Sequence, residues 1–524
     1  MLYQLSYTRF SIFATCLSRL SAGQPVVKPF DLAPRIGWPY AEDSSLRKES
    51  MNKHSLLVTL TCALVWTLGA TTRGESDSYF RRDGGVADDD RRSLPEQFES
   101  KQGFLWRQEL PRGNSTPCVH GDFVFLTTHQ DQELATVCLD RLTGNVRWKR
   151  AVPTSKLEPF HRVGSPASCT PACDGKRVYA FFGSYGLLCY DLDGKPLWER
   201  RLGPFQNEFG ASSSPILVDG KVILNEDHDI NSFLIAIDQK TGDRVWKVPR
   251  DEFARSYSTP IIWEAGGSKQ LVVAGALQLV GYDLKDGSKR WWINGLARIV
   301  NPTPVKAEGM LYVASWTLGG GESGRISMGP WPVASQKWDK NDDGKIVQAE
   351  LPKGPVLRRF FRIDLNQDGG LDESEWTKHA RLFELAQNSI MAVRPGGTGD
   401  LTKTNVVWRY RRELPSCPSP LAYRGVIYTV KNGGIVTSLD AQRGQLLKRG
   451  RIRGQSDYYA SPVAGDGKVY LASEGGVVTV LQAASKWKIL SSHDFGERIM
   501  ATPVIADGSI YLRTDVALYC FGKH

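Results

Sequence analysis

The sequence lacks the motifs by which common enzymes are recognised. It contains no G-x-S-x-G elbow, no H-E-x-x-H helix, no phosphate loop and no kinase signature. Its net charge of +10 is spread thinly over 524 residues, and no block of Lys and Arg is dense enough to form a nucleic-acid face. We therefore interpret the charge as ordinary solvation and expect no nucleic acid among the partners.

Long apolar runs are also scarce. The clearest one covers residues 56–70, about 15 residues, whereas a membrane-spanning helix needs about 20. It follows Met51-Asn52-Lys53, a short basic start typical of a secretory signal. We predict a signal peptide at 51–74, a non-native upstream extension at 1–50 and a disordered linker at 75–102; a buried helix of an N-terminal domain is the alternative for the apolar run. The protein is then exported to the periplasm or the cell exterior, or stays tethered by an uncleaved signal.

A short motif recurs eight times: Ser or Thr, then Pro, then an apolar run. Successive prolines are 41 to 54 residues apart, except for one interval of 116. Intervals of 40–50 residues are typical of the blades of a β-propeller. The eight positions are Thr116-Pro117, Thr170-Pro171, Ser214-Pro215, Thr259-Pro260, Thr303-Pro304, Ser419-Pro420, Ser461-Pro462 and Thr502-Pro503.

Each repeat contains four short strand patterns, A to D. An Asp-Gly turn such as Asp219-Gly220 often separates A from B, a strong hairpin signal. A second tight turn with Gly separates C from D, and most D patterns contain Trp. The final repeat lacks its own strand D, which Phe104–Gln108 can supply. These features predict an all-β, eight-bladed propeller with four-stranded antiparallel blades, closed by the two ends of the chain.

Seven cysteines follow the predicted signal, and an odd number argues against a complete disulfide framework. A bond between Cys169 and Cys173 is the weaker alternative. Three others occupy a repeat position that elsewhere contains Ala, Gly or Ser, so we interpret that position as a packing site for a small side chain. These three are Cys138, Cys189 and Cys520.

The segment Asp238–Trp246, echoed by Asp140–Trp148, resembles the repeat of the pyrroloquinoline-quinone (PQQ)-like propellers. That group includes quinoprotein alcohol dehydrogenases and BamB-type assembly lipoproteins. Pro395–Asp400, followed by Trp408, resembles repeat proteins exported by planctomycete-like bacteria. The resemblance covers roughly residues 103–521 and implies the fold more strongly than any function.

The long interval contains two segments that match the EF-hand pattern D-x-[DN]-x-[DN]-G-x5-E at every defined position. Three side chains, one backbone carbonyl and a bidentate Glu from each loop supply the hard oxygens that Ca²⁺ prefers. We predict two calcium sites in a rigid, structural EF-hand insertion at 317–388 that replaces the B–C turn of blade 5, between propeller segments 103–316 and 389–524. The predicted ligands are Asp339, Asn341, Asp343, Lys345 and Glu350, and Asp364, Asn366, Asp368, Gly370 and Glu375.

The D–A connections between blades should surround the mouth of the central channel on the same face as the insertion. Arginine and aromatic side chains there can hold an anionic ligand or a peptide, although such residues more often only solvate and connect the blades. The candidates for this mouth are Arg162, Arg255, Tyr257, Arg298, Tyr458 and Arg498.

Two classes of function remain open. We favour a non-catalytic, monomeric binding or scaffold module for an envelope protein, a peptide or a polysaccharide. The alternatives are a PQQ-dependent dehydrogenase with a diverged site and a BamB-like assembly factor. Quinoprotein dehydrogenases typically use adjacent cysteines, a Trp floor, a catalytic Asp and a calcium ion bound by Glu and Asn. The sequence has no Cys-Cys pair, and we cannot match the Asp, Glu and Asn residue by residue.

Overall fold

The computed structural model describes residues 78–98, 103–265, 267–321 and 324–522. By its contacts the chain divides into two compact units, Met1–Thr71 and Thr72–His524. The fold described here belongs to the second unit. The predicted upstream extension (1–50) and signal peptide (51–74) lie outside the described residues.

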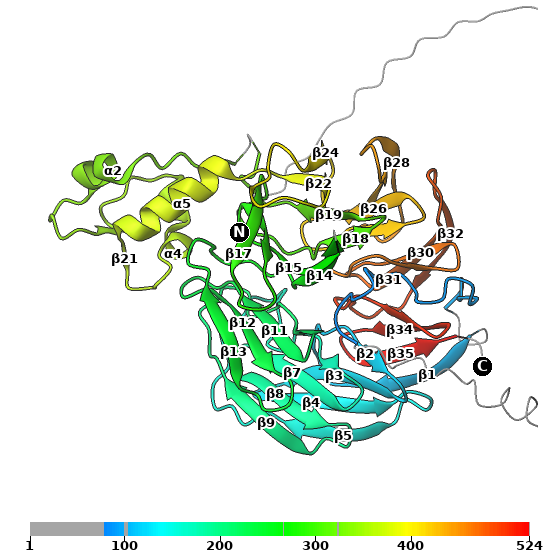
Figure 1. Cartoon of the computed structure of the whole chain (residues 1–524). Helices are drawn as coiled ribbons and strands as arrows, with labels where there is room; N and C mark the ends of the chain where they lie inside the picture. Colours follow the sequence, from blue (N-terminus) through cyan, green and yellow to red (C-terminus); the bar gives the residue numbers. More distant parts are fainter. Residues whose placement is uncertain (1–77, 99–102, 266, 322–323, 523–524) are drawn as a thin grey trace, which may run out of the picture. The chain divides into compact units, whose positions relative to one another are not determined.

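Eight antiparallel four-stranded sheets follow one another along this unit, which confirms the predicted eight-bladed propeller (Figure 1). Blades 1 and 2 consist of β2 (Cys118–His120), β3 (Phe123–Gln130), β4 (Glu133–Asp140), β5 (Val146–Ala151), and β6 (Ala172–Cys173), β7 (Arg177–Phe182), β8 (Gly186–Asp191), β9 (Pro196–Arg201). Blades 3 and 4 consist of β10 (Ile216–Val218), β11 (Lys221–Glu226), β12 (Phe233–Asp238), β13 (Arg244–Pro249), and β14 (Ile261–Ala265), β15 (Ser268–Ala274), β16 (Gln278–Tyr282), β17 (Lys289–Asn294).

The second half repeats the same order. Blades 5 and 6 consist of β18 (Val305–Ala307), β19 (Met310–Ser315), β22 (Ser389–Val393), β24 (Val406–Tyr410), and β25 (Leu421–Tyr423), β26 (Val426–Lys431), β27 (Ile435–Asp440), β28 (Leu446–Arg451). Blades 7 and 8 consist of β29 (Val463–Gly465), β30 (Lys468–Ala472), β31 (Val477–Gln482), β32 (Lys488–Asp494), and β33 (Val504–Ala506), β34 (Ser509–Arg513), β35 (Ala517–Phe521), β1 (Phe104–Glu109). A short strand, β23 (Gly399–Asp400), pairs in parallel with β17.

The two ends of the described propeller meet in blade 8. Strand β1 pairs antiparallel with β35, and Trp106 lies opposite Cys520 (Figure 1). The first strand therefore completes the last sheet, as the sequence predicts. This closure covers the edge of β35, which would otherwise be open to another chain.

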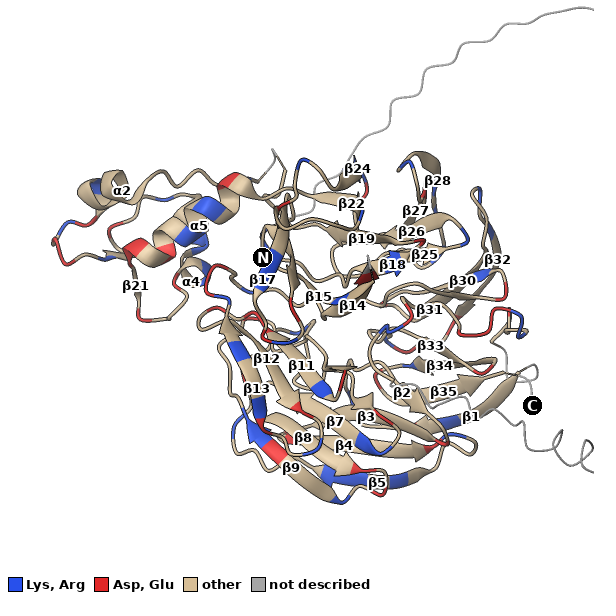
Figure 2. Cartoon of the chain, in the orientation of Figure 1, with Lys and Arg blue, Asp and Glu red and all other residues tan. Residues whose placement is uncertain are grey.

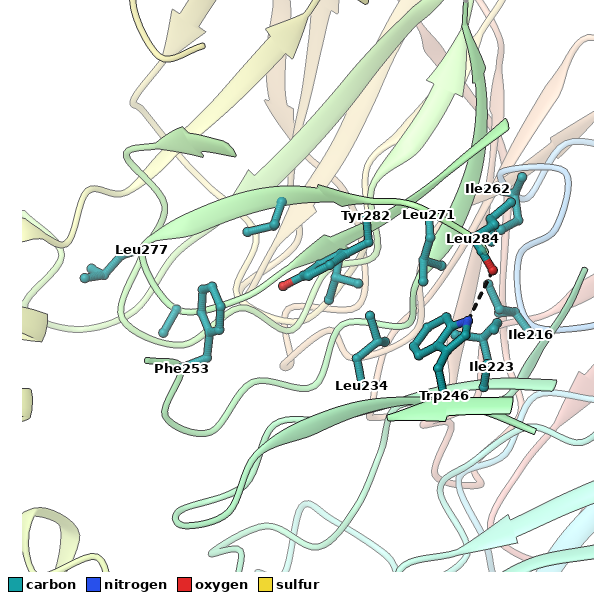
Figure 3. Close-up of a cluster of buried hydrophobic side chains, with 14 of the residues drawn as sticks. Ile216, Ile223, Leu234, Trp246, Phe253, Ile262, Leu271, Leu277, Tyr282 and Leu284 are labelled. Carbon is teal, nitrogen blue, oxygen red and sulfur yellow. Dashed lines mark hydrogen bonds between the residues drawn. The ribbon is translucent and has the colours of Figure 1, made fainter. Parts of the chain in front are cut away.

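Tryptophans of the outer strands connect neighbouring blades. The indole N–H of Trp246 donates to the carbonyl of Leu284 in the next blade at 3.2 Å, within a core that both blades share (Figure 3). Four other tryptophans donate in the same way to the C–D turn of the following blade: Trp106 to Arg141, Trp148 to Leu192, Trp198 to Gln239 and Trp408 to Ala441. At these five junctions, burial of a large ring plus a directed hydrogen bond fixes one blade against the next.

A small residue lies opposite these tryptophans across the C–D strand pair. Cys138 faces Trp148, Cys189 faces Trp198 and Ala236 faces Trp246. The repeat position of Cys138 is therefore a packing position, because a bulky side chain there would meet the indole. Among the described residues no disulfide joins any of the seven cysteines.

Lys and Arg side chains are spread along the outer strands, as Figure 2 shows for β5, β9 and β13. These strands have an unpaired edge, and charged side chains on such an edge resist pairing with another sheet. Several of the charges are balanced nearby; Arg147, for example, lies 2.6 Å from Asp140.

A helical insert separates β19 from β22. It contains α2 (Trp331–Trp338), β20 (Ile346–Val347), α3 (Pro355–Arg358), α4 (Phe360–Ile363), β21 (Gly370–Leu371) and α5 (Glu373–Leu385). The insert has its own apolar core around Trp376, which is fully buried and contacts the rings of Trp331 and Trp338. None of the helices among the described residues is both long and apolar enough to cross a membrane.

The linker prediction for 75–102 is wrong over residues 78–98. We call this segment the strap, because it packs across one end of the channel. Ser78 pairs with Cys173 of blade 2 and Val86 with Ala464 of blade 7. Its Leu94 is only 4% exposed. The charged composition of this segment gave no indication of the packing, because its buried apolar residues are few and follow no repeat.

Candidate functional site

A cavity of about 380 Å³ occupies the central channel, and every blade contributes to its lining. On the face of the D–A connections, its wall contains Phe209, Tyr257 and Tyr459 from these connections. Trp316 and Leu318, which follow β19, complete this part of the wall. The volume falls within the range of small-ligand pockets. We call this cavity the channel pocket.

The wall of the channel pocket contains all eight Ser and Thr residues of the Ser/Thr-Pro motif. Six of their hydroxyl groups accept a hydrogen bond from the backbone N–H of the equivalent residue in the preceding blade. The distances are 2.9–3.0 Å, as in Thr170 N to Ser214 Oγ and Ser419 N to Ser461 Oγ. We call this arrangement the hydroxyl ring.

The strap closes the other end of the channel. Phe80 lines the channel pocket and also a second cavity of about 200 Å³ that the strap itself borders. Arg81 is buried, and its guanidinium donates to the carbonyls of Pro420 and Pro462 in blades 6 and 7. The channel pocket is therefore accessible from the face of the D–A connections.

Two of the six candidates for the mouth line the channel pocket. Tyr257 donates its hydroxyl to Asn207 Oδ1 at 2.6 Å. Arg298 donates its Nε–H to the carbonyl of Leu318 at 3.1 Å. Burial and the nearby guanidiniums of Arg359, Arg255 and Arg362 lower the pKa of Arg298 to about 10.

The other four candidates lie outside this lining. Arg162 is exposed, and Tyr458 is buried with its hydroxyl bonded to the carbonyl of Gly454. Arg498 pairs with Glu474 at 2.6 Å. Arg255 is buried and paired with Asp229 and Glu208. Tyr458, Arg498 and Arg255 therefore serve packing and ion pairing, which is the more common role of such residues.

Several lining residues are missing from the sequence prediction. The hydroxyl ring carried a signal, because a residue that recurs at one position of every blade must lie at the same radius of the ring. Tyr459 follows the predicted candidate Tyr458, and Trp316 ends the predicted propeller segment 103–316. Neither residue belongs to a repeated motif that would have identified it as lining. Phe80 lies in the segment interpreted as a linker, where no pattern pointed to the channel.

The family resemblance implies PQQ as the group that the channel pocket would hold. Among its described residues the channel pocket contains no Asp, no Glu and one cysteine, Cys417. It therefore offers neither adjacent cysteines nor a carboxylate to hold calcium or accept a proton beside a quinone. The residues present do not fit the group.

The first predicted calcium loop bends around its Asp339 carboxylate. Backbone N–H groups of Asp343 and Gly344 donate to it at 3.2 and 2.9 Å. Gly344 has a φ of +80°, the left-handed conformation that glycine tolerates best. Glu350 accepts from the N–H of Lys340 and of Val347, both at 2.9 Å, and so faces the start of the loop.

The second predicted loop has the same internal pattern. The carboxylate of Asp364 accepts from Asp368 N and Gly369 N at 3.2 and 3.0 Å. Glu375 accepts from Leu365 N at 2.6 Å, and its pKa is raised by burial. Helix α5 begins with a capping box between Asp372 and Glu375.

The two loops are joined by the short β20–β21 pair, in which Ile346 lies opposite Leu371. Oxygen atoms dominate both donor sets, as calcium requires. Within the described residues, however, no three Asp, Glu, His or Cys side chains already converge around one metal position. Calcium binding by these loops stays a prediction.

The insert contacts the propeller beside the channel pocket. Arg362 of α4 pairs with Glu208 at 2.8 Å, and the same carboxylate also pairs with Arg255. Gln206 donates its side-chain amide to the carbonyl of Leu365, the second residue of the second loop. The D–A connection between blades 2 and 3 is therefore bonded directly to this loop.

Buried ionisable groups lie between blades 2 and 3. Burial raises the pKa of Glu158 to about 8 and raises that of Glu226, and it lowers the pKa of His228 to about 3. His228 Nε2 lies 3.1 Å from Glu226 Oε2, and its ring stacks on Phe205. None of these residues lines the channel pocket, so we interpret the group as part of the blade interface.

Comparison with protein families gives one match that covers more than half of the chain. The family described as outer membrane protein assembly factor BamB (PQQ_2) matches residues 136–315 and 384–523. The unmatched interval, 316–383, covers nearly all of the helical insert. The match therefore concerns the propeller and not the predicted calcium loops.

Individual relatives are distant. The chain is 24% identical over 178 residues to the quinohemoprotein alcohol dehydrogenase ADH IIB of Pseudomonas putida, covering 32% of this chain and only 25% of the relative. The structure of BamB from Moraxella catarrhalis is similar with a TM-score of 0.51 at 11% identity, covering 80% of this chain and 99% of that one. The computationally designed Ika8 protein is also similar, with a TM-score of 0.51 at 10% identity, over 80% and 100% of the two chains. These structural similarities show the fold alone.

Proposed function

Because the chain belongs to the family of the outer membrane protein assembly factor BamB, we propose that it is a binding or scaffold module of the cell envelope. In this proposal the protein binds its partner reversibly on the face that surrounds the channel pocket. An assembly factor for envelope proteins, as the name of the family suggests, is the more specific form of the same proposal.

The composition of the channel pocket is the observation that carries this proposal. The pocket is open on one face, is closed by Phe80 at the other end and is lined by hydroxyl, amide and aromatic groups. Such a lining can bind a ligand, but its described residues offer no activated nucleophile and no acid–base pair for a chemical step.

A PQQ-dependent dehydrogenase is the competing proposal. The similarity to ADH IIB is its support, but it covers a quarter of that enzyme. The channel pocket lacks the acidic residues with which such an enzyme would hold calcium and accept a proton. We therefore prefer the binding module.

We further propose that the helical insert binds two calcium ions and acts as a rigid support for the binding face. The internal hydrogen bonds of both loops favour this proposal, as does the β20–β21 pair that joins them. The contact between Glu208 and Arg362 would transmit the rigidity of the second loop to the wall of the channel.

Site-specific photocrosslinking in the cell that makes the protein tests the binding face. A photoreactive amino acid at Trp316, which lies at the rim and is 37% exposed, should form covalent adducts with envelope material. The matched control is Leu142, which is 77% exposed in a C–D turn on the opposite face. Equal adduct formation from both positions, or none from Trp316, would reject the proposed face.

A further inference from the structure

The channel pocket is rich in hydrogen-bond donors and poor in negative charge. Its described lining contains no carboxylate, and Arg298 is its one charged side chain. Most ligand pockets combine a few convergent polar groups with apolar walls, and those polar groups set the class of ligand. The donors of this pocket therefore favour a ligand that carries hydrogen-bond acceptors and negative charge.

The hydroxyl ring supplies the first set of donors. Each of six hydroxyl oxygens already accepts a backbone N–H from the neighbouring blade, as Thr259 does from Ser214 at 3.0 Å. A hydroxyl group has one hydrogen to donate. Within the described residues these six hydroxyls donate to no protein acceptor, so their O–H groups are available to a ligand.

Arg298 supplies the second set. Its Nε–H bonds to Leu318, and its guanidinium lies over the Phe383 ring of α5, 5.4 Å from the ring centroid. Its Nη groups donate a hydrogen bond to no described residue. The neighbouring arginines differ: Arg255 pairs with Asp229 and Glu208, and Arg362 pairs with Glu208. Arg298 therefore presents the planar fork that binds carboxylates bidentately, without a carboxylate of its own in the described part of the chain.

Aromatic side chains line the same cavity as this guanidinium. Phe209 and Tyr257 contact each other edge to face, with ring centroids 6.0 Å apart. Trp316 and Tyr459 line the same cavity. Large apolar faces beside a cation suit a ligand that joins a charged head to an apolar body.

We propose that the channel pocket recognises a carboxylate carried on an apolar or aromatic body, with the carboxylate held by Arg298 and the hydroxyl ring. The ligand is a free organic acid or the carboxylate of a peptide. This inference rests on the proposed binding function and specifies its ligand. It involves no covalent or redox step.

Titration calorimetry on the full chain tests the inference with two pairs of probes. The small pair is 3-phenylpropionate and its neutral amide, and the peptide pair is N-acetyl-glycyl-phenylalanine and its C-terminal amide. We expect at least one acid to bind tenfold or more tightly than its amide. A tighter peptide acid indicates a chain end as the natural ligand, and a tighter small acid indicates a metabolite.

Three variants locate the effect. Arg298→Gln should abolish the difference between acid and amide, whereas Arg162→Gln, an exposed arginine outside the lining, should keep it. Arg298→Lys retains the charge without the fork and should keep part of the difference, which preserves the test if the Gln variant fails to fold.

Equal binding of acids and amides by the wild type would overturn the inference, as would an undiminished acid preference in Arg298→Gln, or in Arg298→Lys if the Gln variant fails to fold. Failure of this experiment is distinguishable from failure of the proposed function. Photocrosslinking from Trp316 would still succeed if the face binds its partner by another chemistry.

Discussion

Single glycines in the C–D turns contribute to the contact between blades. Gly242 has a φ of +75°, and a Cβ added there would lie 2.7 Å from the Trp198 ring of the preceding blade. The same approach recurs at Gly144, Gly194, Gly287 and Gly444. The turn therefore needs glycine both for its left-handed backbone and for the space that the indole fills.

Replacing Gly242 with Ala should cost more stability than replacing Gly220. Gly220 has nearly the same φ, +74°, but nothing lies within 4 Å of its added Cβ. We expect Gly220→Ala to lower the free energy of unfolding by about 1 kcal/mol through backbone strain alone. Gly242→Ala should lose about a further 1–2 kcal/mol through overpacking. Urea denaturation measures both; equal losses would contradict a packing role for the glycine.

Glu158 should make stability fall as pH rises. Its pKa is about 8 in the folded protein and near 4.5 when unfolded, so the folded state holds a proton that the unfolded state releases between these values. His228 acts in the opposite direction, but only below about pH 6.5. From pH 6.5 to 8 we therefore expect a loss of up to about 2 kcal/mol from Glu158.

Thermal unfolding at pH 6.5 and pH 8 checks this expectation. Glu158→Gln should reduce the pH dependence in this interval, because the amide does not ionise and can still accept from Ala211 N. Exposed Glu264→Gln is the control and should leave the dependence unchanged. Glu226 has a pKa shifted in the same direction, so part of the slope should persist in the Glu158 variant.

Among the structural elements, the strap (residues 78–98) has a stabilising role that the sequence did not predict. Its backbone pairs with Cys173 of blade 2 and with Ala464 of blade 7, which lie far apart in the ring. Arg81 and Asp90 add hydrogen bonds to blades 6 and 7. The strap therefore adds a second closure to the ring beside the β1–β35 pair.

Arg81→Ala should destabilise the propeller by about 2–3 kcal/mol, because two buried carbonyls would lose their donor. Arg91→Ala is the control within the same segment, since the Arg91 side chain is 89% exposed. Chemical denaturation should show the loss for Arg81 and no change for Arg91. An unchanged Arg81 variant would mean that the strap does not stabilise the ring.

The two predicted calcium loops can be tested at the same scale. Glu375→Gln should weaken calcium binding at the second loop at least tenfold, because a bidentate carboxylate is lost. Glu373 lies two residues before Glu375 in α5, and its side chain is exposed. The Glu373→Gln variant should therefore bind calcium normally. Calorimetry with CaCl₂ distinguishes them, and Glu350→Gln probes the first loop. Equal heats for the wild type and a Glu350→Gln, Glu375→Gln double variant would refute the calcium assignment.

At the scale of the whole molecule, repetition determined what the sequence could predict. Eight Ser/Thr-Pro dipeptides and the recurring Trp indicated the number of blades, their four strands and the closure by residues 104–108, because every blade repeats the same packing. The channel pocket was harder to predict. Tyr257 and Arg298 line it, but Arg162 and Arg498 do not. Arg498 pairs with Glu474 instead, a contact that no repeat position predicts. Phe80 was missed because no repeat contains it.

The central claim is that this propeller binds a ligand in its channel without oxidising it. The most direct test adds PQQ and Ca²⁺ to the purified full chain and measures alcohol- and sugar-dependent reduction of an electron-accepting dye, with a quinoprotein dehydrogenase as the positive control. We predict a rate no higher than that of the cofactor alone, because no carboxylate lines the channel pocket in the part of the chain that the structure describes. Sustained turnover by this chain would contradict the account.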